Sequence, residues 1–116
     1  MKGRLAVIKE YGKPFEIVEY DVPDPEPGAV LLRITQAGIC GTDLHTWRGD
    51  TRQSPIPPEG RAMGHEGTGV VYKLGEGVTS DALGAPLHEG DRVIHSAIFP
   101  CNHCHNCLRG DPNLCS

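Results

Sequence analysis

Residues 64–78 read Gly-His-Glu-Gly-Thr-Gly-Val-Val-Tyr-Lys-Leu-Gly-Glu-Gly-Val, a short apolar run between two groups of glycines. The run at 69–74 predicts a β-strand, because Val and Tyr favour strands, and Gly-Glu-Gly at 75–77 predicts the turn that ends it. His65 and Glu66 precede this run by a few residues, and both residue types can bind a metal ion. The stretch therefore combines a strand with two candidate metal ligands.

Four further runs have the same character, being rich in β-branched and aromatic residues and bounded by Gly, Pro or Asp. They cover residues 5–8, 15–20, 30–35 and 92–96. In the third of these, Val30, Leu32 and Ile34 fall on one face and Arg33 and Thr35 on the other, which predicts one buried face. Only two short helices are predicted, at 42–48 and 104–109, so a parallel β-α-β fold is excluded. We expect a mostly β domain over residues 1–116, with an antiparallel, barrel-like arrangement.

The chain has 116 residues, which suits one domain of the usual size of about 100–200 residues. Its net charge is −4 and its charges form no long block of one sign, so we expect no binding to nucleic acid or to a membrane. No apolar run approaches the ~18 residues that cross a bilayer, and the N-terminus has no signal-peptide core. These features predict a cytoplasmic protein.

Four of the five cysteines are close together near the C-terminus. They are Cys101, Cys104, Cys107 and Cys115. This spacing favours a metal site, because tetrahedral zinc takes four soft ligands and five cysteines cannot all pair in disulfides. Four protein ligands would close the coordination shell, so we predict a structural zinc lobe over residues 100–116, with His103 and His105 facing solvent. An iron–sulfur cluster is one alternative, although its common bacterial motif has a shorter final spacing. Free or disulfide-linked thiols are the other.

The fifth cysteine, Cys40, follows the run at 30–35, far along the chain from His65. Such a pair is by itself a weak sign of a metal site, because lone Cys and His residues are often structural. Their neighbours strengthen the case, since Glu66 follows His65 and Asp43 follows Cys40 by three positions. Catalytic zinc sites use three protein ligands and a carboxylate that orients the ligating imidazole. The sequence supplies all these residue types except the third ligand.

Together these features resemble the zinc-dependent alcohol dehydrogenases of the medium-chain dehydrogenase/reductase superfamily, in particular their catalytic, GroES-like domain. Residues 64–78 resemble the zinc signature of that family, residues 101–115 its structural-zinc lobe, and Gly-Asp-Arg-Val at 90–93 the strand-opening motif between them. The resemblance covers practically the whole chain. It implies a GroES-like antiparallel β-barrel with one catalytic and one structural zinc ion. The implied reaction is reversible oxidation of an alcohol or polyol to a carbonyl by hydride transfer to NAD or NADP.

The resemblance also implies a role for each residue of the catalytic zinc site. Cys40 and His65 would be zinc ligands, and Glu66 would be a nearby acid or transient ligand. Asp43 would orient His65. In the family the third ligand is a Cys, Asp or Glu that lies well beyond the part of the chain corresponding to residue 116.

Three further side chains receive roles toward the substrate. Thr42 takes the hydroxyl position that accepts the substrate proton, and a helix N-cap is its compatible alternative. His45 falls where some members place the outer end of a proton relay. Trp47 either lines the alcohol site or packs the domain. The implied partner is a small alcohol or carbonyl compound, while the particular alcohol, the choice of NAD or NADP and a homo-oligomeric state stay open.

The sequence has no Gly-x-Gly-x-x-Gly turn of the kind that binds the cofactor pyrophosphate in the Rossmann domain of this family. We therefore expect an incomplete catalytic domain that is inactive by itself. The alternative is a stand-alone β-barrel, stapled by zinc, that acts as a non-catalytic interaction or scaffold module.

Overall fold

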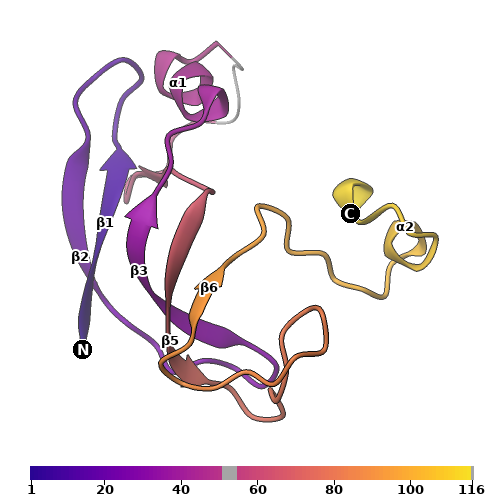
Figure 1. Ribbon diagram of the computed structural model, residues 1–116. Coiled ribbons are helices and arrows are strands. Elements are labelled where there is room, and N and C mark those ends of the chain that lie inside the picture. The colour runs from indigo at the N-terminus through magenta and orange to yellow at the C-terminus, as the bar shows by residue number, and fades with distance from the viewer. Residues whose placement is uncertain (51–54, 116) are drawn as a thin grey trace.

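The computed structural model describes residues 1–50 and 55–115. Among these residues the strands are β1 (Lys2–Ile8), β2 (Glu16–Asp21), β3 (Val30–Ala37), β4 (Arg61–Ala62), β5 (Gly67–Leu74) and β6 (Arg92–Ile94), as Figure 1 shows. The helical segments are α1 (Gly41–Arg48), α2 (His105–Leu108) and a single 3-10 turn, η1 (Pro112–Leu114). The predicted mostly β fold is confirmed. The short elements β4 and η1, of two and three residues, have no strong sequence signal.

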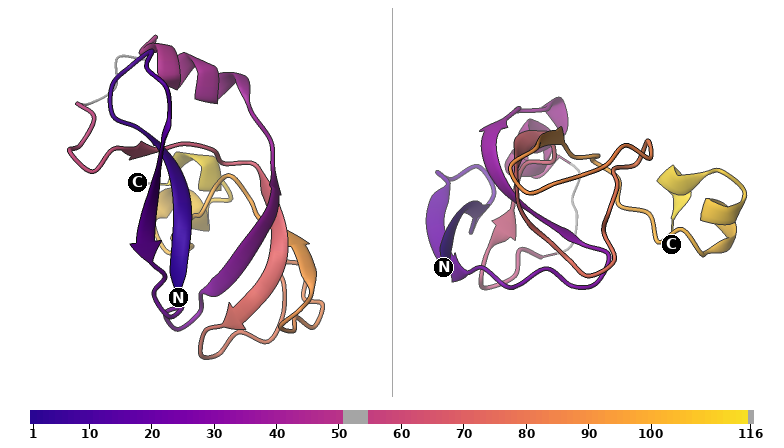
Figure 2. Two further views of the ribbon diagram at one scale, coloured as in Figure 1. Left: turned by 90° about the vertical axis from the view of Figure 1, so that its left-hand side faces the viewer. Right: turned by 60° about the horizontal axis from the view of Figure 1, so that its bottom comes forward.

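The strands form two antiparallel sheets, in the orders β2-β1-β4 and β3-β5-β6. Figures 1 and 2 show the sheets next to each other, with α1 at one end of both. In the part of the chain that the structure describes, no hydrogen-bonded ladder joins the sheets. The barrel expected from the resemblance is therefore present as two open sheets, and their shared end carries the helix.

The apolar core is thin. The buried apolar side chains among the described residues are Val7, Ile8 and Val71, each at most 2% exposed. Ile34, which the alternating pattern predicted to be buried, is instead 50% exposed. Two irregularities interrupt the pairing of β3 with β5, and Ile34 lies opposite Gly69, which offers no side chain to cover it. A fully buried aliphatic side chain contributes about 1.5–3 kcal/mol to the stability of the folded state, so a core of three such residues stabilises the fold only weakly.

Helix α1 is held against the β1–β2 hairpin. The Gly12 backbone N–H donates to the Trp47 carbonyl at 2.8 Å, and the Trp47 indole N–H donates to the Lys13 carbonyl at 2.7 Å. The chain is still extended at Cys40, with φ −93° and ψ 158°, so this residue is the helix N-cap. The alternative role of Thr42 as N-cap is therefore wrong, because Thr42 already lies inside the helix.

The C-terminal segment projects away from both sheets (Figures 1 and 2). It contains α2, whose flanking residues Cys104 and Arg109 are the ends of the predicted helix, followed by η1. No helix among the described residues has the length and apolar character needed to cross a membrane.

Candidate metal centres

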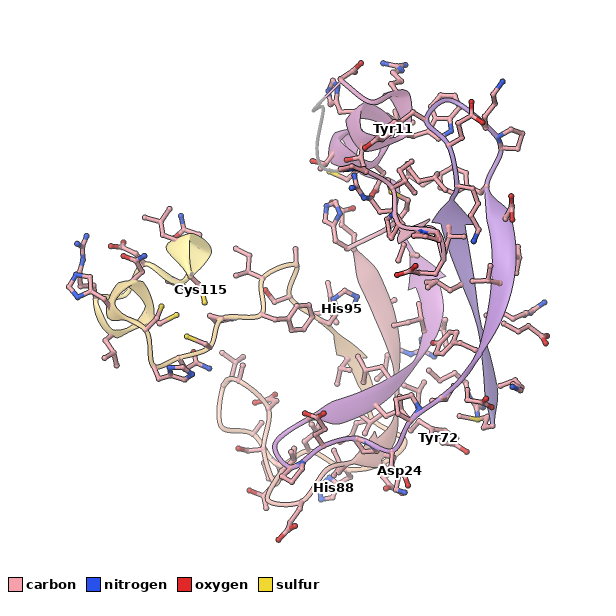
Figure 3. The ribbon with its side chains drawn as sticks, turned by 180° about the vertical axis from the view of Figure 1, so that it is seen from behind. Tyr11, Asp24, Tyr72, His88, His95 and Cys115 are labelled. Atoms are coloured by element: carbon pink, nitrogen blue, oxygen red, sulfur yellow. The ribbon has the colours of Figure 1, made fainter. Side chains whose placement is uncertain are left out.

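The four cysteines of the C-terminal segment converge. Their Sγ atoms all lie within 4.8 Å of one another, and those of Cys101 and Cys107 are 3.9 Å apart. Zn–S bonds of about 2.3 Å in a tetrahedron place neighbouring sulfurs about 3.8 Å apart, so the spacing fits one zinc ion. This sulfur–sulfur distance is far longer than a disulfide bond, and none of the five cysteines is in a disulfide. Figure 3 shows Cys115 well apart from the strand that carries Tyr72.

Backbone N–H groups point at these sulfurs. The N–H of Cys104 donates to Cys101 Sγ at 3.2 Å, and the N–H of Cys101 donates to Cys115 Sγ at 3.3 Å. Hydrogen bonds from the backbone of His103 and Cys104 lower the pKa of Cys101, whereas desolvation raises the pKa of Cys107 to about 12. An iron–sulfur cluster would place several iron atoms between the sulfurs, so this compact set suits a single ion better. His103 and His105 are exposed, as expected.

A second group of donors forms where β3 ends and β5 begins. One ligand atom from each of Cys40, His65 and Glu66 lies within 4.8 Å of the other two. The β3–β5 ladder explains how distant residues meet, since Ala37 pairs with Gly67 and the Gly38 N–H donates to the Glu66 carbonyl at 2.9 Å. Thiolate, imidazole and carboxylate are ligands that zinc accepts. This donor set fits a zinc ion with a coordination position left for another molecule.

Asp43 ties together the two segments that carry these donors. Its Oδ2 accepts the backbone N–H of Cys40 at 2.9 Å, and its Oδ1 accepts the N–H of Gly64 at 3.2 Å. The same Oδ1 lies 3.6 Å from Nδ1 of His65, and the side chain of Asp43 is only 12% exposed. The bond to Cys40 is half of a capping box, because Asp43 is the third residue of α1. The three-residue spacing between Cys40 and Asp43 was the sequence signal for this hydrogen bond, which sequence reasoning missed.

Gly38 leaves room for the Glu66 carboxylate. A Cβ atom at position 38 would lie 2.6 Å from Glu66 Oε2, which is closer than real Cβ contacts. Any side chain there would displace the carboxylate. The glycine therefore helps to place Glu66 beside Cys40 and His65, a role that the sequence pattern did not reveal.

The two predicted proton-handling residues lie on α1. Thr42 Oγ1 is 3.7 Å from Cys40 Sγ, so its hydroxyl lies beside the second group of donors. His45 lies one turn further along the helix, with Nδ1 2.9 Å from Asp50 Oδ2. The structure thus places Thr42 next to a candidate ligand and pairs His45 with an acid that sequence reasoning did not single out.

An apolar cavity of about 450 Å³ opens beside Asp43 and Gly64. Its walls include Phe15, Ile39, Leu44, Trp47 and Met63. Trp47 both lines this cavity and anchors α1 through its bond to Lys13. Trp47 therefore packs the domain, and its role beside the alcohol stays a prediction.

Comparison with known proteins identifies the family of this chain. Residues 26–116 match the family model of the Alcohol dehydrogenase GroES-like domain. The chain is 45% identical over 115 residues to an S-(hydroxymethyl)glutathione dehydrogenase of Synechocystis sp., which covers 99% of this chain and 29% of that relative.

Solved structures show the same fold. An alcohol dehydrogenase from Thermotoga maritima matches with a TM-score of 0.80 at 30% identity, over 99% of this chain and 31% of that one. The cobalt- and zinc-bound thermostable alcohol dehydrogenase from Pyrobaculum aerophilum matches with a TM-score of 0.77 at 31% identity, over 100% of this chain and 33% of that one. The resemblance and the GroES-like fold inferred from the sequence are confirmed. The chain belongs to the alcohol dehydrogenase GroES-like domain family.

Proposed function

We propose that residues 1–116 form the catalytic domain of a zinc-dependent alcohol dehydrogenase, with a structural zinc lobe at 100–116. The reaction is reversible oxidation of an alcohol or polyol to a carbonyl compound by hydride transfer to NAD or NADP. The convergence of Cys40, His65 and Glu66 beside the Thr42 hydroxyl carries this proposal. These residues supply three metal donors and a hydroxyl that accepts a proton, close enough together to act on one bound molecule.

Each donor has a distinct task. Cys40 and His65 hold the zinc ion, and Glu66 acts as a nearby acid or transient ligand. Asp43 keeps the imidazole of His65 oriented through its position 3.6 Å from Nδ1. When bound, zinc lowers the pKa of an alcohol hydroxyl and polarises a carbonyl.

Thr42 and His45 handle the substrate proton. The Thr42 hydroxyl takes the proton from the alcohol and releases its own toward His45, which lies on the same face of α1 because the two residues are three positions apart. His45 is 60% exposed, so it can pass the proton to water. In carbonyl reduction the protons move in the opposite direction.

The nicotinamide cofactor is bound mainly by a separate nucleotide-binding domain. Two observations support this: the sequence has no Gly-x-Gly-x-x-Gly turn, and the chain spans about a third or less of its relatives. The 116 residues by themselves therefore lack dehydrogenase activity. Five cysteines outside disulfides suit a reducing, cytoplasmic compartment.

The test is NAD(P) reduction by the zinc-loaded protein that contains both domains. The substrate panel includes S-(hydroxymethyl)glutathione, which the name of the Synechocystis relative suggests, together with a simple primary alcohol and a polyol. We expect turnover with at least one substrate and its loss in Cys40→Ser. Intact lobe zinc without any hydride transfer would support the scaffold role instead. Steady NAD(P) reduction by the 116-residue chain alone would contradict the need for a second domain.

A further inference from the structure

Helix α1 has a carboxylate facing a histidine at each of its ends. At the N-terminal end Asp43 Oδ1 lies 3.6 Å from Nδ1 of His65. At the C-terminal end Asp50 Oδ2 lies 2.9 Å from Nδ1 of His45. In both pairs the acid faces Nδ1, which leaves Nε2 of the ring for another partner. The first pair belongs to the candidate zinc site, whereas in the second pair only His45 has a proposed role and Asp50 has none.

The fold fixes Asp50 against His45 by more than this side-chain contact. Gly49 ends α1 in the left-handed conformation, with φ 79°, and its N–H bonds back to the Thr46 carbonyl at 3.0 Å. The next N–H, that of Asp50, donates to the His45 carbonyl at 3.0 Å. Asp50 therefore binds both the backbone and the ring of the same residue. An exposed ion pair of this kind contributes little to the stability of the fold, so its main effect is on the His45 ring.

A carboxylate has no proton to donate, so the 2.9 Å contact requires the hydrogen to lie on Nδ1 of His45. A neutral imidazole has only one N–H, and Nε2 must then carry a free lone pair. A proton acceptor at the end of a relay needs this lone pair. The Nε2–H tautomer would present an N–H instead and could not accept the proton.

We propose that Asp50 is a positioning residue that holds His45 in the Nδ1–H tautomer, so that Nε2 accepts the proton released by Thr42. This role rests on the proposed function. During alcohol oxidation Thr42 gains the substrate proton as it gives up its own, and Nε2 gains a proton that it then passes to water. Asp50 neither gains nor loses a proton, and no bond to it forms or breaks.

Nitrogen-15 NMR of the histidine rings tests this role without any need for turnover. In the zinc-loaded chain, labelled with ¹⁵N-histidine and assigned with His45→Gln, neutral His45 should show protonated Nδ1 and unprotonated Nε2. Asp50→Asn should lose this fixed tautomer, and Asp50→Glu should restore it. The control is Asp21→Asn, which removes another exposed carboxylate, 2.8 Å from Lys2, and should leave His45 unchanged. Protonation at Nε2 in the unsubstituted chain, or an unaltered ring in Asp50→Asn, would overturn the proposal.

A kinetic measurement on the protein with both domains completes the test. Asp50→Asn should lower kcat about tenfold or more with little change in KM, since positioned acid–base groups contribute about 10²–10⁴-fold. Asp50→Glu should recover most of the rate. An unchanged kcat in Asp50→Asn would overturn the relay role of Asp50. An Nδ1–H ring in a protein that transfers no hydride to any substrate would overturn the proposed function and, with it, the relay, but not the tautomer assignment.

Discussion

The two metal centres differ in what holds their donors in place. The cysteines of residues 101–115 lie in a segment that projects from the sheets, where Leu108 and Leu114 are 75% and 57% exposed. Such a segment has almost no apolar core, and the proposed zinc ion would take the place of one. Cys40, His65 and Glu66 are instead held by the β3–β5 ladder and by Asp43. The proposed zinc ion would therefore matter for the structure of the lobe, whereas the strand ladder and Asp43 would hold the second centre in place with or without an ion.

Removing a lobe ligand should give the largest effect. Cys107→Ser should reduce bound zinc from about two ions per chain to about one and unfold the lobe, because structural zinc supplies about 10–16 kcal/mol of apparent binding free energy in small zinc domains. Elemental analysis and limited proteolysis measure both changes, and chelator should likewise increase cleavage within residues 101–115. Cleavage that stays unchanged after zinc removal would show that the lobe does not need a metal.

Cys40→Ser is the reciprocal substitution. It should also remove one zinc ion, because a three-donor site loses its thiolate, but the protease pattern of residues 101–115 should not change. The two centres can thus be emptied one at a time. If this variant unfolded the lobe, the two centres would be coupled and the contrast between them would fail.

Asp43→Asn should have an intermediate effect on the second centre alone. Loss of a carboxylate behind a ligating histidine costs about 10–100-fold in metal affinity, and Asp43 also binds the backbone of Cys40 and Gly64. Competition with a chromophoric chelator measures the change. Asp24→Asn is the control, because Asp24 is an exposed acid paired with Lys73 at 2.6 Å, away from the metal donors. Equal affinities in the two variants would exclude a positioning role for Asp43.

Gly38→Ala should have the smallest effect. The new methyl group pushes the flexible Glu66 carboxylate aside, so we expect a few-fold loss of metal affinity at the second centre with little change in folding. Gly41→Ala is a matched control, since a Cβ at Gly41 meets no atom within 4 Å. The same chelator competition compares the two. A loss that is equal in both variants would mean that Glu66 takes no part in metal binding.

The same contrast explains what the sequence could and could not predict. The four-cysteine lobe depends on neighbouring residues, so spacing alone identified its donors. The meeting of Cys40 with His65 depends on long-range strand pairing, so the neighbouring residues gave only a weak sign of it, and the family resemblance carried the prediction. The room at Gly38 and the pairing of Asp50 with His45 depend on side-chain placement in space, which no periodic pattern encodes.

The fold was predicted where local signals are strong and missed where they are weak. Glycine, proline and β-branched residues marked the longer strands and both helices to within a few residues. The burial of Ile34 was wrong, because irregular pairing and the facing Gly69 leave that side of β3 uncovered. The N-cap was misplaced because Cys40, which is not a usual capping residue, occupies it with the help of Asp43.

Zinc K-edge X-ray absorption on the metal-loaded chain and its two cysteine variants tests most directly whether two unlike ions are bound. Cys40→Ser should leave a shell of sulfur alone at about 2.3 Å, and Cys107→Ser should leave a mixed shell with nitrogen or oxygen at about 2.0–2.2 Å. The unsubstituted chain should show the sum of the two spectra. A sulfur-only shell in Cys107→Ser, or no zinc left in that variant, would contradict a separate, accessible centre at Cys40 and His65.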